Sequence, residues 1–159
     1  MISAIDTNVL LDLLVPDAAF GDSSEAALID SSGAGALVIS ETVYSELSAQ
    51  FPDDGDLDRF LDETGVRLER SSTAALHAAG QAWREYASRR GQSLTCAKCG
   101  EAISVRCEVC DARQRPRQHL LADFLIGAHA VHHADRLVTR DRGYYATYFP
   151  KLELYPPRA

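Results

Sequence analysis

Five short strand-like runs, separated by longer stretches of helical character, constrain the fold of this 159-residue chain more than any other feature. The runs cover residues 1–5, 36–39, 66–69, 136–139 and 152–155. Each has the length of a β-strand, and capping residues and apolar periodicity in the intervals indicate helices. Strands that alternate with helices predict a mostly parallel sheet covered on both faces. We therefore expect an α/β fold, with residues 152–155 as an edge strand.

The expected helices follow recognisable start and stop signals. We place them over residues 9–14, 23–30, 41–50, 56–63, 74–90 and 121–133, with a short aromatic helix or turn over 144–149. Ser40 and either Ser71 or Ser72 have the side chains that cap helix starts. Gly65 and Gly91 are placed to end helices.

One acidic residue, Asp123, lies inside the otherwise apolar stretch L-A-D-F-L-I-G-A-H-A, where an unpaired carboxylate would be costly to bury. Asp6 and Asp141 directly follow strand-like runs, and Glu46 belongs to an early helix. Because the carboxyl ends of parallel strands share one edge, the four acids could converge there. Clustered carboxylates would favour a hard divalent cation such as Mg²⁺ or Mn²⁺, which can support phosphodiester hydrolysis.

Each acid also has an ordinary structural interpretation. Asp6 could be a helix N-cap, Glu46 a solvated helical residue and Asp141 a turn residue. Asn8 is interpreted as a helix-start residue, and the histidines near Asp123 are not needed as bases. The sequence alone leaves these alternatives open.

All four cysteines form two C-x-x-C pairs, Cys96-Ala-Lys-Cys99-Gly and Cys107-Glu-Val-Cys110-Asp, separated by seven residues. Such pairs predict a closed, structural Cys₄ site for Zn²⁺, here a minimal zinc ribbon. Bare thiols or a redox pair are the alternatives. We therefore divide the chain into a main domain, residues 1–91 and 119–159, and an inserted segment, residues 92–118.

Charge is unevenly distributed along the chain, whose net charge is −7. Residues 84–119 contain eight Lys or Arg and four acids, so this segment carries +4 and the remainder −11. A basic segment on an acidic body suits contact with a polyanion on one side, although a solvated loop is the simpler alternative. No apolar run reaches the ~18–20 residues that span a bilayer, and no signal peptide is evident. We expect a cytoplasmic protein without membrane contact.

Four segments together resemble the PIN-domain ribonucleases, and most closely the VapC-type toxins. They are D-T-N-V-L-L-D, V-Y-S-E-L, L-A-D-F-L-I-G-A-H-A and L-V-T-R-D-R-G-Y-Y-A-T-Y-F-P. The resemblance implies a three-layer α/β/α sandwich, Mg²⁺- or Mn²⁺-dependent endoribonuclease activity, frequent homodimers and a cognate antitoxin. By position, Asp6 and Asp123 would be the principal metal ligands, Glu46 and Asp141 would complete the acidic cluster, and Thr139 would add a hydroxyl.

Three functions follow from these patterns. The leading hypothesis is a metal-dependent endoribonuclease that serves as the toxin of a type II toxin–antitoxin pair. The second is a housekeeping RNA-processing PIN nuclease with the ribbon as a docking element. The third is a non-enzymatic zinc-ribbon module that binds RNA or protein on a nuclease scaffold, which the presence of all four acids argues against. Arginines of the insert could contact RNA phosphates (Arg106, Arg113, Arg115 and Arg117).

Overall fold

The computed structural model describes residues 1–15, 19–89, 94–95, 102–103, 105–112, 121–141 and 143–155. Its strands are β1 (Ile2–Ile5), β2 (Ala36–Ile39), β3 (Val66–Leu68), β4 (Leu94–Thr95), β5 (Ala102–Ile103), β6 (Arg136–Val138) and β7 (Glu153–Tyr155). Its helices are α1 (Thr7–Leu14), α2 (Gly21–Ala34), α3 (Glu41–Ser48), α4 (Asp54–Thr64), α5 (Thr73–Arg89), α6 (Leu121–His133) and α7 (Gly143–Tyr148). All five strands expected from the apolar runs are present.

The main sheet has the strand order β3-β2-β1-β6-β7, and every neighbouring pair is parallel. The predicted parallel sheet and its edge strand at residues 153–155 are therefore confirmed. β1 lies at the centre, with Ala4 paired to Val38 on one side and to Leu137 on the other. The chain moves from β1 outward through β2 and β3, then crosses back to β6 on the other side of β1. This reversal between β1 and β6 is the position where open α/β sheets form a ligand crevice.

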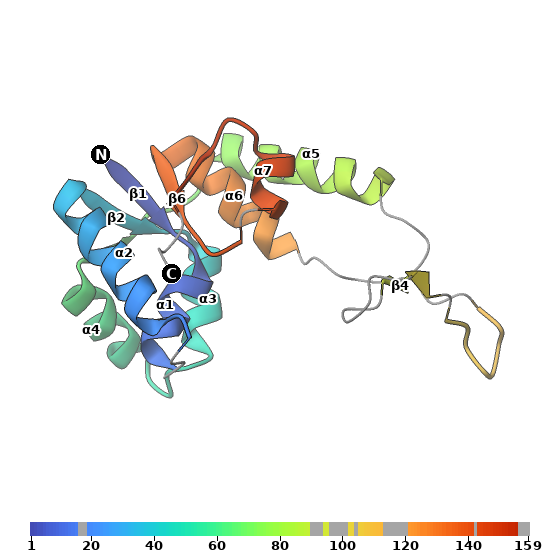
Figure 1. Cartoon of the computed structure of the whole chain (residues 1–159), viewed down its shortest axis with the longest axis horizontal. Helices are drawn as coiled ribbons and strands as arrows, with labels where there is room; N and C mark the ends of the chain where they lie inside the picture. Colours follow the sequence, from blue (N-terminus) through green and yellow to red (C-terminus); the bar gives the residue numbers. More distant parts are fainter. Residues whose placement is uncertain are drawn as a thin grey trace.

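Helices cover both faces of the sheet and give the three-layer arrangement (Figure 1). α1 and α2 pack together, with α2 against β2, whereas α5 packs on α6, which lies against β1 and β6. α3 contacts both α1 and α6, so it bridges the two groups of helices. That position brings Glu46 toward the edge where β1 and β6 end.

Aromatic rings fix α6 in the core. Phe124 is fully buried, and its ring centroid lies 4.9 Å from that of Tyr144, 5.4 Å from Trp83 and 5.5 Å from Tyr86. These contacts join α5, α6 and α7. Burial of such rings contributes strongly to stability, and it holds the first turn of α6, which contains Asp123, in a defined place.

Three of the expected helix signals are confirmed, whereas α2 differs from its expected bounds. Gly91, expected to end the helix that begins near residue 74, lies outside the described residues. Ser40 accepts the N–H of Val43 at the start of α3, and Gly65 ends α4 with φ +68°. Ser72 accepts the N–H of Ala75 at the start of α5. α2 runs from 21 to 34 rather than from 23 to 30, and it ends where Gly35 passes against the backbone of Met1 with φ +155°. A side chain at this position would collide with that backbone, so close packing determines where α2 ends.

The cysteine-containing insert is described only in part. β4 and β5 form an antiparallel pair, and residues 105–112 include Cys107 and Cys110, whereas Cys96 and Cys99 lie outside the described residues. None of the helices within the described ranges is long and apolar enough to span a membrane.

Candidate active site

A cavity of about 340 Å³ opens at the carboxyl ends of β1 and β6. It is lined by Asp6, Thr7, Asn8, Leu11, Glu46, Asp123, Ile126, Asp141 and Tyr145. All four acids predicted from the sequence therefore lie around one cavity, although they come from four separate segments. A larger groove of about 830 Å³ lies between α5 and α7, but among the described residues that line it Glu85 alone is acidic.

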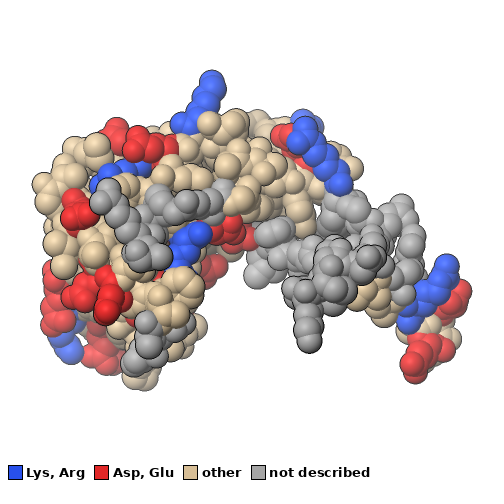
Figure 2. All heavy atoms as spheres, viewed as in Figure 1, with Lys and Arg blue, Asp and Glu red and all other residues tan. Residues whose placement is uncertain are grey.

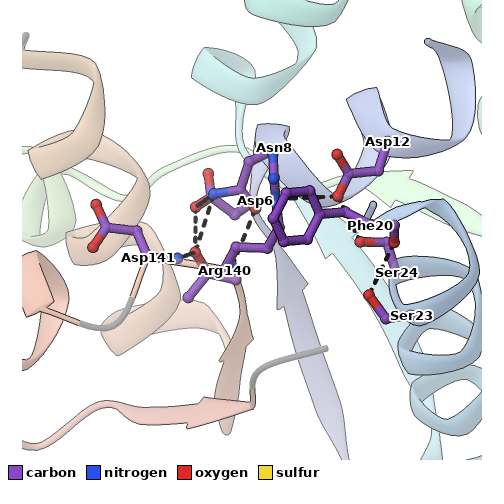
Figure 3. Close-up of polar contacts among 9 residues, drawn as sticks. Asp6, Asn8, Asp12, Phe20, Ser23, Ser24, Arg140 and Asp141 are labelled. Carbon is purple, nitrogen blue, oxygen red and sulfur yellow. Dashed lines mark hydrogen bonds and ion pairs between the residues drawn. The ribbon is translucent and has the colours of Figure 1, made fainter. Parts of the chain in front are cut away.

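Asp6 is the most constrained of these acids. It directly follows β1, its N–H donates to the carbonyl of Val138, and the residue is only 5% exposed. One carboxylate oxygen, Oδ2, accepts hydrogen bonds from Thr139 Oγ1 (2.6 Å), Asn8 Nδ2 (2.7 Å) and Tyr145 Oη (3.4 Å). Two donors from distant parts of the chain and one from the start of α1 thus orient a single carboxylate. Figure 3 shows Asn8 beside Asp6.

Burial raises the pKa of Asp6 from 3.8 to about 6. The hydrogen bond from Thr139 opposes this shift, whereas the carboxylates of Asp123 and Glu46 raise the pKa further. Asp123 and Glu46 therefore lie close enough to Asp6 to disfavour its negative charge. Burial, together with the negative charge of Asp6, also raises the pKa of Tyr145, so its hydroxyl stays protonated and can donate to Asp6.

Asp123 and Glu46 reach the cavity from two helices. Asp123 lies in the first turn of α6, next to the buried ring of Phe124. Glu46 lies on α3, and its Oε2 accepts a hydrogen bond from the hydroxyl of Thr7, the residue after Asp6. As expected, α3 and α6 therefore place an acidic side chain at the edge of the sheet where the strands have their carboxyl ends.

Asp141 occupies a different part of the cavity wall. The residue is exposed, its Oδ1 accepts the N–H of Tyr144 at 3.3 Å, and its own N–H donates to Thr139 Oγ1 at 3.0 Å. In Figure 3 its carboxylate stands apart from Asp6. Asp141 thus supports the start of α7 and adds negative charge at the mouth of the cavity.

An ion pair between the partly exposed Arg140 and the buried Asp12 holds the segment that carries Asp141. Arg140 Nε lies 3.1 Å from Asp12 Oδ2, and Ser24 donates to the same oxygen at 2.6 Å. The guanidinium group of Arg140 also stacks over the ring of Phe20, 4.3 Å from its centroid, and the backbone N–H of Arg140 donates to Asn8 Oδ1. The segment after β6 is therefore tied to α1 and α2 (Figure 3).

Three of these residues contribute in ways that were not predicted from the sequence. Asn8 connects Asp6, Thr139 and Arg140, rather than serving only at the start of α1. Its spacing two residues after Asp6 was the available signal. Asp12 lies within the apolar run V-L-L-D-L-L, a background as apolar as that of Asp123. Tyr145 had no comparable signal.

The donor atoms around the cavity determine which ions it suits. In the described part of the chain, no group of three or more His, Cys, Asp or Glu is arranged so that it could hold a metal ion as it stands. The cavity nevertheless presents carboxylate oxygens, with hydroxyl groups beside them, which are the ligands of Mg²⁺ and Mn²⁺. A divalent cation would also relieve the electrostatic cost that raises the pKa of Asp6. The chemistry of the donors therefore fits a hard cation.

Comparison with protein families identifies the fold. A profile of the PIN domain matches residues 4–150. The chain belongs to the PIN-domain family. PIN domains are generally nucleases, and the acidic cavity lies entirely within the matched range. Comparison with curated protein sequences gives no significant match.

Solved structures share the fold along almost the entire chain. VapBC2 from Rickettsia felis, bound to a DNA fragment from its promoter, matches with a TM-score of 0.59 and 18% identity, over 98% of each chain. A toxin–antitoxin complex from Klebsiella pneumoniae gives the same values. FitAcB from Neisseria gonorrhoeae matches with a TM-score of 0.55 and 16% identity, over 99% of this chain and 98% of the other. At these identities the likeness concerns the fold.

Proposed function

We propose that this PIN-domain protein is an endoribonuclease that depends on Mg²⁺ or Mn²⁺. The observation that carries the proposal is the convergence of Asp6, Glu46, Asp123 and Asp141 around one cavity at the switch point of the sheet. Nuclease activity is general in the family. The choice of RNA as substrate rests on the resemblance of the four sequence segments to PIN-domain ribonucleases.

The chain's own groups have distinct tasks in this mechanism. Asp6 and Asp123 would hold the metal ion, and Glu46 and Asp141 would assist directly or through water. When bound, the ion would supply positive charge for the scissile phosphate and lower the pKa of an attacking water. Thr139 and Asn8 keep the carboxylate of Asp6 oriented. Because Asp6 must be ionised to bind a cation, its proton leaves to solvent before the site is competent.

The surface charge limits how RNA can approach. Figure 2 shows acidic side chains gathered over the part of the viewed face where α2 and α4 lie in Figure 1. The exposed acids of these two helices include Asp22, Glu25, Asp58 and Asp62. RNA phosphates are bound largely through positive charge, so this acidic surface would repel them. We therefore expect RNA to approach along the basic segment, residues 84–119, rather than across α2 and α4.

We further propose that the protein is the toxin of a type II toxin–antitoxin pair in the cytoplasm, that it forms a homodimer and that a cognate antitoxin neutralises it. Support comes from the similar solved structures, two of which are described as VapBC2 and as a toxin–antitoxin complex. A housekeeping RNA-processing enzyme would share the chemistry and differ in its partner. Expression of the chain alone should arrest growth, and coexpression of the adjacent small gene should restore it. Normal growth at full expression of active enzyme would contradict the toxin role and favour RNA processing.

The nuclease proposal is tested with purified protein and a panel of RNAs. Cleavage should require Mn²⁺ or Mg²⁺, should stop with a chelator and should be lost in Asp6→Asn and in Asp123→Asn. Asp62→Asn is the matched control, because it removes an exposed carboxylate on α4 that does not line the cavity. Circular dichroism should show that all three variants are folded. Cleavage at the wild-type rate by both site variants would refute the mechanism.

A further inference from the structure

We propose that Phe20 is a stacking platform for one unpaired RNA base beside the acidic cavity, held in place by Arg140 and Asp12. This inference rests on the proposed nuclease function and narrows its substrate class to single-stranded RNA. Phe20 directly precedes α2 and is 42% exposed. It does not belong to the hydrophobic core that the described residues form. Core packing therefore does not explain an aromatic ring at this position.

The exposed ring of Phe20 has a defined support. The guanidinium carbon of Arg140 lies 4.3 Å from the ring centroid, so one face of the ring is covered. Arg140 is fixed in turn by the buried Asp12, whose Oδ2 lies 3.1 Å from Nε and accepts the hydroxyl of Ser24. The backbone N–H of Ser24 donates to the carbonyl of Phe20 at 2.9 Å. The ring is therefore preorganised, which lowers the entropic cost of stacking a base on it.

The same support places the ring beside the cavity. Arg140 directly precedes Asp141, which lines the cavity. The backbone N–H of Arg140 donates to the side chain of Asn8, which itself donates to the carboxylate of Asp6. Figure 3 shows the ring of Phe20 beside Arg140, on the side of Asp6 away from Asp141 in this view. RNA with a phosphate in the cavity can therefore place a neighbouring base on Phe20.

An aromatic ring backed by a guanidinium group suits an unpaired base. Unpaired bases stack on aromatic side chains and on arginine guanidinium planes when proteins bind single-stranded RNA. Every base has a π-face, so such a contact tolerates any sequence. The bases of a duplex are already stacked on one another and are not available to an external ring. The platform therefore favours single-stranded RNA over double-stranded RNA.

The acidic surface of α2 limits this contact to about one base. Asp22 and Glu25 are exposed and follow Phe20 closely in the sequence. A base carries no charge and can rest on the ring, whereas the phosphates of further nucleotides would be repelled by these acids. RNA that approaches along residues 84–119 and occupies the cavity would therefore end its contact with the protein at Phe20.

A single exposed apolar side chain does not by itself indicate a binding site. Ile29, also on α2, is 64% exposed and serves as a comparison. Phe20 differs because a cation covers one face of its ring and a buried carboxylate holds that cation. The simpler alternative is that Phe20 only shields the ion pair between Arg140 and Asp12. In that case its loss would disturb the segment before Asp141 and lower kcat, without a specific effect on RNA affinity.

Cleavage kinetics separate these two roles. With single-stranded RNA and Mn²⁺, Phe20→Leu should raise KM by about 5- to 150-fold, the range for loss of one stacked base, and leave kcat nearly unchanged. Phe20→Tyr, which keeps a ring, should have a KM near that of wild type. Ile29→Ala is the matched control and should behave as wild type. A wild-type KM in Phe20→Leu, or a reduced kcat at unchanged KM, would overturn the proposal.

Tryptophan fluorescence tests the platform without cleavage. Phe20→Trp adds a second tryptophan to Trp83, and its additional emission relative to wild type should be quenched by single-stranded poly(U) in a chelator. An RNA duplex of the same length should quench it much less. Absence of quenching, or equal quenching by the duplex, in a chain that cleaves RNA would overturn the platform alone. If the chain cleaves no RNA, the proposed nuclease function fails and this titration still decides whether Phe20 binds an unpaired base. The titration also decides if Phe20→Leu misfolds.

Discussion

As the pH rises, the unfolding free energy of metal-free Asp6→Asn should increase relative to that of metal-free wild type. The same substitution should abolish cleavage. The folded chain binds a proton at Asp6 more tightly than the unfolded chain does, because burial raises this pKa from 3.8 to about 6. A group with a raised pKa favours the folded state below its unfolded pKa, and this contribution is lost as the pH rises through the folded pKa. Wild type should therefore lose stability relative to Asp6→Asn between about pH 4 and about pH 7.

The size of the effect follows from the two pKa values. A change from 3.8 to about 6 is a roughly 150-fold difference in proton affinity. Since tenfold corresponds to about 1.4 kcal/mol, the difference in unfolding free energy should change by about 3 kcal/mol across this range. Asparagine also alters the hydrogen bonds with Thr139 and Asn8, but that cost is independent of pH and shifts the curve without changing its slope.

The assay is urea unfolding of both proteins in a chelator at several pH values, followed by circular dichroism. Asp62→Asn provides the control, since its carboxylate is exposed and its curve should run parallel to that of wild type. A constant difference between wild type and Asp6→Asn at all pH values would refute the reasoning. Added Mn²⁺ should then stabilise wild type by about 2.7 kcal/mol at a hundredfold excess over Kd, and should leave Asp6→Asn nearly unchanged.

Three further substitutions test how the site is supported. Gly127→Ala should destabilise the protein by about 1–3 kcal/mol in thermal unfolding, because the added methyl group would collide with the ring of Phe149, and an unchanged Tm would contradict this close contact. Phe124→Ala should cost about 3–5 kcal/mol in urea unfolding and reduce cleavage, whereas a smaller loss would mean that the aromatic cluster does not anchor α6. Arg140→Gln should cost about 1–3 kcal/mol by leaving Asp12 buried and unpaired. Adding Asp12→Asn should recover part of that loss, and strictly additive effects in this double-mutant cycle would argue against the ion pair.

The strands and most helices could be predicted because local patterns determine them. Short apolar runs end at polar residues, and residues such as Ser40 and Gly65 terminate helices by local geometry. The order of the strands in the sheet was not predicted. An apolar run indicates that a strand is buried, but it does not indicate which other strand lies beside it. The length of α2 was also underestimated, because its end depends on a contact between Gly35 and Met1, which are distant in sequence.

The free-energy cost of burying a carboxylate predicts that an acid in an apolar stretch has a polar partner. It singled out Asp123 in an apolar stretch, and the structure places Asp123 at the cavity. The same criterion applies to Asp12, which is only 6% exposed and has Arg140 and Ser24 as partners. An acid in an apolar run therefore predicts a polar partner, which can be another side chain as readily as a metal ion.

The partners of Asp6 explain why its chemistry could not be predicted from local sequence. Thr139 and Tyr145 lie more than 130 positions from Asp6 in the sequence. The pairing of β1 with β6 brings Thr139 beside Asp6, and Tyr145 reaches it from α7. Their hydrogen bonds hold the carboxylate in place, whereas burial beside Asp123 and Glu46 makes its negative charge costly. The ionised form of such a buried carboxylate is poorly stabilised by solvent. A bound cation therefore stabilises it more than it would stabilise a solvated carboxylate. The same packing that raises the pKa of Asp6 would therefore favour metal binding above about pH 6.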